Sequence, residues 1–396
     1  MIPWIHTHVL PNSKVIPCCV SDYLDVFGDL KKNTLKDIWN GARYRTMRRL
    51  MIADRPVFSC NKCYELEKSG IQTMRGRMNR EFSHHSKVLK ETKNNGYLKD
   101  PKMRYFDIRF SNICNFKCRG CSPALSTKWY EDYQKLWNFE SKEPKLINAT
   151  KDSPTLWEEI IDYLPQVEVA YFAGGEPLLM DEHYQTLEKL IEIGNTDITL
   201  QYNTNLSILK FKKYDLINIW KHFKEVELTV SLDDIETRGE YFRSGLDWEK
   251  LISNFKEVRK NFPHFYFQVN CTISLFNIHR IPEIHSALMD FGFIDSSGFN
   301  FNTLLDPPEY RTQVLTKRLK VQTTLKLKSY IDGLSKKYPN MDWSYFKGSL
   351  ENQIHFMNSA DLSQNIPDFK KMTLKLDQLR SENFSHVYPE LSSLVE

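Results

Sequence analysis

Polar and apolar positions alternate in six short runs of the sequence, and longer stretches with helical spacing lie between them. The runs cover 105–110, 167–172, 198–204, 226–232, 265–274 and 299–304, and the helical stretches include 155–164, 183–193, 208–223 and 248–262. Strands that alternate with helices are typical of βα units on a parallel sheet or partial barrel. We therefore predict an α/β core over residues 105–310.

A different pattern precedes this core. Residues 4–10 alternate like a strand, residues 11–13 are turn formers, and a second short strand leads to Cys18 and Cys19. Helical spacing over 35–51 is followed by Cys60 and Cys63. The pattern predicts a small cysteine-bearing module over residues 1–85.

The segments on either side of the core are polar. Residues 86–104 carry several lysines and few apolar anchors, so we interpret them as a solvated linker. Residues 311–396 have helical spacing, with the clearest helices predicted at 315–334 and 369–379. We expect this last region to form a helical cap that packs on the core.

The six predicted strands carry an unusually polar set of alternate residues. Side chains two apart point to one face of a strand, and a filled barrel interior is usually aliphatic. A polar lining therefore indicates a wet cavity for a polar substrate, unless the side chains simply bond to one another, as neighbours such as Asp107 and Arg109 can. The set consists of Asp107, Arg109, Gln201, Asn203, Asn205, Thr229, Ser231, Asp233, Gln268, Asn270, Thr272, Asn300 and Asn302.

Composition narrows the class of protein. Hydrophobic residues make up 41% of the 396 residues and charged residues 26%, as in ordinary globular proteins. A net charge of +4 does not indicate a nucleic-acid partner. The sequence shows neither an apolar run of the ~18–20 residues that a membrane span needs nor a signal pattern at its first residues, so we expect a cytoplasmic protein.

The grouping of the cysteines in the sequence indicates metal binding. Seven of the eight lie in three groups, and in a reducing compartment such grouping favours metal binding over disulfides. Cys114, Cys118 and Cys121 have C-x3-C-x2-C spacing directly after a predicted strand. Three thiolates on one loop suit a 4Fe–4S cluster with one iron left open, whereas zinc with a fourth ligand from elsewhere is the alternative. Cys271 lies inside a predicted strand, and we expect it to be a core residue.

The C-x3-C-x2-C loop resembles the radical S-adenosylmethionine (SAM) superfamily, and further motifs follow successive predicted strands. Gly174-Gly175-Glu176-Pro177 resembles the GGEP motif, 203–205 the TNG-like segment, 231–233 the S-[IL]-D segment and 241–245 the Y-x-R-x-G segment. The resemblance implies a (βα)6 partial barrel that cleaves SAM to a 5′-deoxyadenosyl radical. It also implies that Cys114, Cys118 and Cys121 hold the 4Fe–4S cluster and that SAM contacts Gly174, Gly175, Glu176, Pro177, Asn203, Ser231, Asp233 and Arg243.

The N-terminal segment is similar to the auxiliary-cluster modules called SPASM or twitch domains. The likeness rests on Pro3-Trp4, Cys18-Cys19, 27–30, 35–40 and Cys60-x-x-Cys63, although such modules usually follow the core. It implies an auxiliary iron–sulfur cluster bound by Cys18, Cys19, Cys60 and Cys63. The fourth ligand stays open, because the alternatives to a second cysteine of the pair are His6, His8 or an iron left open to substrate. A zinc ribbon is the alternative to the cluster itself.

Together these expectations describe a radical SAM enzyme. The substrate is expected to be a polar small molecule or peptide, the electron donor a flavodoxin or ferredoxin, and the outcome oxidative if the auxiliary cluster is redox-active. No residue that acts directly on the substrate is predicted. A redox-neutral isomerase or group-transfer enzyme and a non-catalytic zinc protein are the alternatives.

Overall fold

The computed structural model describes residues 1–68, 73–138 and 145–396, and the chain forms two compact units. The first unit contains residues 1–113, 146–202 and 210–226. The second contains residues 114–145, 203–209 and 227–396.

The first unit is built on a parallel sheet that the N-terminal segment extends. Strands β4 (Tyr105–Ile108), β5 (Val169–Phe172) and β6 (Thr199–Thr204, of which all but the last two residues belong here) are parallel neighbours. The short strand β1 (His8–Val9) runs parallel to β4, with His8 opposite Asp107. Antiparallel β2 (Lys14–Ile16) and β3 (Gly28–Asp29) follow β1. The cysteine module therefore shares a sheet with the first strands of the core.

Short helices surround this sheet and the cysteines. In the cysteine module and the segment after it they are α1 (Ile2–Ile5), α2 (Leu35–Trp39), α3 (Ala42–Ile52), α4 (Asn61–Lys68), α5 (Met74–Glu81) and α6 (Lys87–Glu91). The later ones are α8 (Ala149–Asp152), α9 (Leu156–Tyr163), α10 (Asp181–Glu192) and α11 (Leu216–Trp220). Helices α9 and α10 confirm the predictions for 155–164 and 183–193.

Three local predictions in this unit were wrong in part. The strand expected over 4–10 is reduced to β1, because the chain starts with the helical turn α1. The helix expected over 35–51 is two helices, which Gly41 separates by adopting an extended backbone. In the stretch 208–223, expected to be one helix, only α11 is helical. A hairpin of β7 (Lys210–Phe211) and β8 (Tyr214–Asp215) precedes it, and the turn of this hairpin places Lys212 in the left-handed region.

The second unit contains the other parallel strands and their helices. Strands β9 (Glu225–Ser231, whose first two residues belong to the first unit), β10 (Tyr266–Ile273) and β11 (Phe299–Thr303) are parallel neighbours. Helices α7 (Trp129–Trp137), α12 (Glu236–Phe242), α13 (Trp248–Asn261) and α14 (Ile281–Asp290) accompany them. All six predicted strands are thus confirmed, and so is the helix predicted over 248–262.

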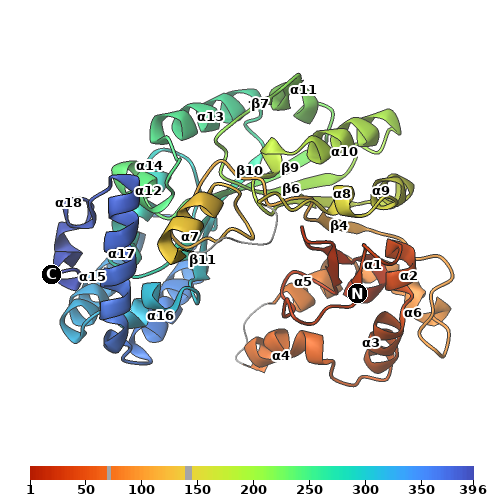
Figure 1. Cartoon of the computed structure of the whole chain (residues 1–396), viewed down its shortest axis with the longest axis horizontal. Coiled ribbons are helices and arrows are strands. Elements are labelled where there is room, and N and C mark those ends of the chain that lie inside the picture. The colour runs from red at the N-terminus through yellow and green to blue at the C-terminus, as the bar shows by residue number, and fades with distance from the viewer. Residues whose placement is uncertain (69–72, 139–144) are drawn as a thin grey trace. The chain divides into compact units, whose positions relative to one another are not determined.

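The C-terminal region is helical, as predicted. It consists of α15 (Lys317–Lys337), α16 (Ser344–Asn358), α17 (Ile366–Arg380) and α18 (Phe384–Val387). Helix α15 packs against α16, and α17 packs against α7, the yellow helix in Figure 1. Aromatic rings pack the C-terminal region against the rest of the second unit. The ring centroid of Phe276 lies 5.5 Å from that of Phe369 and 5.8 Å from that of Phe384. Such edge-to-face contacts stabilise the packing beyond the contribution of the buried apolar area.

Burial alternates along the core strands as the sequence pattern predicts. In β10 the apolar residues are buried, and the polar residues between them are half-buried. Strands β6 and β9 show the same alternation. The polar face of these strands is therefore half-buried, and on it Gln268 accepts hydrogen bonds from Thr229 and Asn300 at 3.4 and 2.8 Å. Within the described ranges no helix is long and apolar enough to cross a membrane.

Candidate active site

The loop that carries Cys114, Cys118 and Cys121 is fixed by the backbone at the end of α12. The amide of Lys117 donates to the carbonyl of Ser244, and the amide of Arg119 donates to that of Phe242, both at 2.8 Å. The indole of Trp129 donates to the carbonyl of Cys118 at 2.6 Å. These bonds satisfy main-chain groups that a tight loop would otherwise leave unpaired. They also join two of the predicted motifs, the cysteine loop and the segment 241–245.

Arg243 connects the cysteine loop to the end of β9. Its Nε lies 2.8 Å from Oδ2 of Asp233, and its Nη1 donates to the Cys118 sulfur at 3.7 Å. Both Asp233 and the guanidinium are buried. A buried guanidinium needs a counter-charge, and the Asp233 carboxylate supplies it. The structure thus brings together three residues that were predicted from separate motifs.

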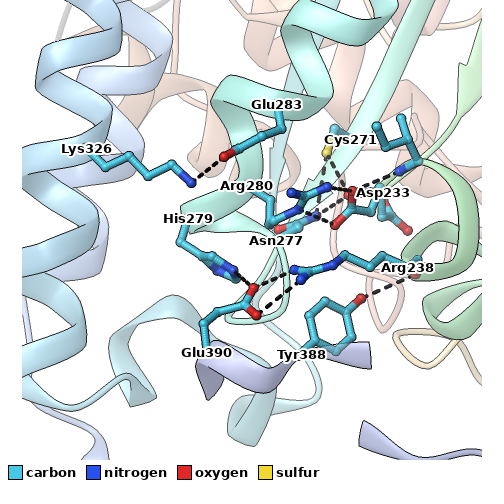
Figure 2. Close-up of polar contacts among 12 residues, drawn as sticks. Asp233, Arg238, Cys271, Asn277, His279, Arg280, Glu283, Lys326, Tyr388 and Glu390 are labelled. Atoms are coloured by element: carbon cyan, nitrogen blue, oxygen red, sulfur yellow. Dashed lines mark hydrogen bonds and ion pairs between the residues drawn. The ribbon is translucent and has the colours of Figure 1, made fainter. Parts of the chain in front are cut away.

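Asp233 is itself held on several sides. Its Oδ1 accepts from the amide of Thr272 at 2.7 Å, and its carbonyl accepts from Asn277 at 2.8 Å. Figure 2 shows Asn277 and Cys271 directed toward Asp233, while Glu390 binds Arg238 and His279 in a neighbouring group. Because both carboxylate and main chain are bonded, Asp233 presents a fixed negative charge to Arg243.

The thiols of Cys118 and Cys121 lie in surroundings that disfavour a bare thiolate. Burial raises the pKa of Cys118 above its ordinary value, although the positive charge of Arg243 opposes this. Burial also raises the pKa of Cys121 to about 12, and the nearby Cys118 adds to the increase. Thiolates that are unfavourable alone are stabilised by a bound metal. This chemistry fits a loop whose function is to hold a metal cluster.

The segment after β6 approaches the same loop. Asn205 donates from Nδ2 to Oδ1 of Asn115, and Asn115 donates to the Ser207 hydroxyl, each at 2.9 Å. Asn203 and Ser231 are half-buried at the ends of their strands, with Ser231 opposite Asn270 in the register of β9 and β10. Contact of Asn203 and Ser231 with SAM stays a prediction.

The Gly174–Pro177 motif lies in the first unit, directly after β5. Gly174 and Gly175 have φ angles of 85° and 55°, in the left-handed region that favours glycine. A Cβ at Gly175 would lie 2.3 Å from the carbonyl oxygen of Ile113, so a side chain does not fit there. The buried Glu176 carboxylate accepts from the amide of Leu178 at 3.1 Å and caps the short helix that starts at Pro177. The role of this motif toward SAM stays a prediction.

Three of the four N-terminal cysteines share a cavity of about 800 Å³ in the first unit. Cys18, Cys60 and Cys63 line it. The pKa of Cys60 is raised to about 12, chiefly by burial and then by the nearby Cys18 and Cys63. This cavity offers three of the four thiolates that an iron–sulfur cluster usually takes.

Cys19 lies apart from this group. Its pKa is raised to about 12, mainly by burial and then by the charge of Asp107. Among the described residues that line the cavity, neither Cys19 nor His6 nor His8 is included. The choice of fourth ligand stays a prediction.

Asp107 and Arg109 pair with each other, as one of the two sequence interpretations expected. Arg109 Nε lies 2.5 Å from Asp107 Oδ1, and both side chains are largely buried. Burial alone would raise the pKa of Asp107, but the charges of Arg109 and His8 hold it below its usual range. This pair is therefore an ion pair between neighbours on one strand face.

The described residues contain two groups of three potential ligands that lie close enough together to share one ion, and neither group includes a cysteine.

The acidic residues that hold the cysteine loop through Arg119 were not predicted from the sequence. Arg119 is fully buried, and its guanidinium binds Asp377 and Glu382 at 2.5 and 2.6 Å. Asp377 lies 258 positions away in the sequence. Neither spacing nor composition connects residues so far apart, so only the motif position of Arg119 between two cysteines gave any signal.

Two family models match the chain. Residues 108–285 match the radical SAM superfamily, and residues 1–64 match SPASM, an iron–sulfur cluster-binding domain. No curated protein matches the chain.

Several solved structures are similar to the chain at low sequence identity. One is anSMEcpe with bound AdoMet and the Cp18Cys peptide, at 16% identity and a TM-score of 0.42, with 66% of this chain and 68% of that chain covered. Another is Streptococcus suis SuiB bound to S-adenosylmethionine, at 17% identity and a TM-score of 0.40, with 72% and 64% covered. SuiB bound to its precursor peptide SuiA has 15% identity and a TM-score of 0.39, with 70% and 58% covered.

Proposed function

Because the chain belongs to the radical SAM superfamily and carries a SPASM domain ahead of its core, we propose that it removes a hydrogen atom from a polar substrate. The cofactors are SAM, a 4Fe–4S cluster and the iron–sulfur cluster of the SPASM domain. SAM on the reduced cluster supplies the 5′-deoxyadenosyl radical for this step. The contact of Arg243 with both Asp233 and the Cys118 sulfur carries the proposal, because it joins three motifs around one thiol.

In this proposal Cys114, Cys118 and Cys121 hold the cluster. Arg243 is fixed by Asp233, and its planar guanidinium suits the carboxylate of SAM. Glu176 offers an acceptor for the ammonium of SAM, and the backbone of Gly174 and Gly175 allows close approach to a ligand. These residues bind and orient SAM, while the half-buried polar residues of β6, β9 and β10 offer hydrogen bonds to the substrate.

We further propose an oxidative outcome in which the auxiliary cluster accepts an electron. Cys18, Cys60 and Cys63 would hold that cluster in their shared cavity. A redox-neutral isomerisation or a group transfer is the competing outcome. The product distinguishes the two outcomes. Only the oxidative reaction yields a product with two hydrogens fewer than the substrate and releases one reducing equivalent per turnover.

Anaerobic reconstitution with iron and sulfide tests the proposal. We expect a brown protein with two clusters that converts SAM to 5′-deoxyadenosine when dithionite is added. A colourless zinc protein that leaves SAM intact would overturn it in favour of a metal-binding protein without catalysis. Deuterated amino acids, sugars, nucleotides and peptides can then be screened for transfer of deuterium into 5′-deoxyadenosine, which identifies the class of substrate.

A further inference from the structure

Two histidines and an aspartate meet in the interior of the first unit, outside the cysteine cavity. His6 and His8 come from the N-terminal segment, and Asp107 lies on β4 opposite His8. All three are at most 2% exposed. One ligand atom from each lies within 4.8 Å of those from the other two.

The orientation of His6 leaves a lone pair without a partner. Its Nδ1 lies 2.9 Å from the carbonyl oxygen of Tyr105, which can only accept, so Nδ1 carries the proton. Nε2 is then a bare acceptor, and it makes no hydrogen bond to the part of the chain that the structure describes. An imidazole that donates one N–H to a carbonyl and directs the other nitrogen into a buried site has the usual arrangement of a metal ligand.

His8 and Asp107 approach each other in a way that suits a shared ion. His8 Nδ1 pairs with Asp107 Oδ2 at 2.9 Å, and a metal ion bound between the two atoms would replace this contact. Two ligands bound tetrahedrally at about 2.0–2.1 Å from a metal lie roughly 3.3 Å apart. The two atoms are therefore near the separation of neighbouring ligands. Arg109 binds Oδ1 through Nε at 2.5 Å and also donates from Nη2 to Oδ2 at 3.3 Å.

We propose that His6, His8 and Asp107 form a binding site for a divalent transition-metal ion, zinc or ferrous iron. Two imidazoles and one carboxylate are a ligand set that these ions accept. Since His8 and Asp107 belong to neighbouring strands, the ion would tie β1 to β4. The proposal is independent of SAM cleavage, because no residue of the cysteine loop takes part.

The site is tested on the full-length protein with both clusters reconstituted. After incubation with Zn²⁺ and dialysis, we expect one zinc ion per chain beyond the cluster iron, measured by elemental analysis. His6→Ala and Asp107→Asn should lose at least tenfold in zinc affinity, whereas the exposed His264→Ala should retain it. The iron content and circular dichroism of each variant show whether clusters and fold are intact.

Zinc K-edge absorption on the wild-type protein gives a second readout that needs no variant. We expect nitrogen and oxygen ligands with imidazole scattering and no sulfur. Sulfur ligands, no retained zinc, or equal retention by a folded His6→Ala variant would overturn the site. If the variants fail to fold, the spectrum of the wild-type protein still decides the question.

Discussion

The guanidinium of Arg119 and the carboxylate of Asp377 form a buried ion pair at 2.5 Å, which joins the loop between Cys118 and Cys121 to the last turn of α17. Arg119 also lies over the ring of Tyr241, 3.8 Å from its centroid, and the Tyr241 hydroxyl donates to Asp377 at 2.7 Å. The amide of Phe384 donates to the other carboxylate oxygen. The C-terminal region is thus bonded to the loop that carries Cys114, Cys118 and Cys121.

Asp377→Ala should therefore destabilise the protein by about 2–4 kcal/mol, because it leaves a buried guanidinium with Glu382 alone as its counter-charge. Urea unfolding of the cluster-free protein measures this. Glu65→Ala, which removes an exposed ion pair with Lys68, serves as the control and should cost less than about 1 kcal/mol. Equal effects of the two changes would show that the pair contributes nothing.

Arg243→Lys should weaken SAM binding by about 10-fold or more, because an ammonium cannot contact Asp233 and a carboxylate with the geometry of a guanidinium. Binding of SAM to the oxidised, cluster-loaded protein measures the change without turnover. The iron content should stay at the wild-type level, since Arg243 is not a ligand. An unchanged dissociation constant for SAM would exclude Arg243 from the SAM site.

Cys118→Ala should abolish the formation of 5′-deoxyadenosine and lower the iron content by about one cluster. Cys271→Ala is the matched control for loss of a thiol, since Cys271 is buried within β10, and it should retain the iron of both clusters. Iron analysis and product chromatography measure the two quantities. Full SAM cleavage by Cys118→Ala would refute the assignment of this loop.

Cys60→Ala should keep part of the SAM cleavage but stop the formation of an oxidised product, since it disrupts only the N-terminal cavity. The ratio of 5′-deoxyadenosine to modified substrate is the measurement, once a substrate is known. The wild-type ratio in this variant would mean that the auxiliary cluster has no redox role.

Asp234 should make the stability depend on pH between about 4 and 6. Burial raises its pKa to about 6, despite the nearby Arg280. The unfolded value is about 3.9, so the folded protein binds more protons in this range and its free energy of unfolding falls as the pH rises, by about 2–3 kcal/mol. Asp234→Asn should remove this slope, which urea unfolding at several pH values measures. The same slope in both proteins would assign it to another group.

The six core strands were predictable because their alternation is a local property, and so was the pairing of Asp107 with Arg109, two residues apart on one strand. The hairpin around Lys212 was not, since its apolar spacing also fits a helix and only the left-handed turn decides between them. The partners of Arg119 could not be predicted from the sequence for another reason. They lie more than 250 positions away, and their distance in space depends on the whole second unit.

The pairing of β1 with β4 has a consequence for how the chain acquires its structure. During synthesis the second edge of β1 stays uncovered until β4, almost 100 positions later, has been made. Until then His8 and Val9 are part of an open edge that is liable to pair with other chains. A fragment that ends before Tyr105 should therefore aggregate, whereas one that includes β4 and β5 should stay dispersed.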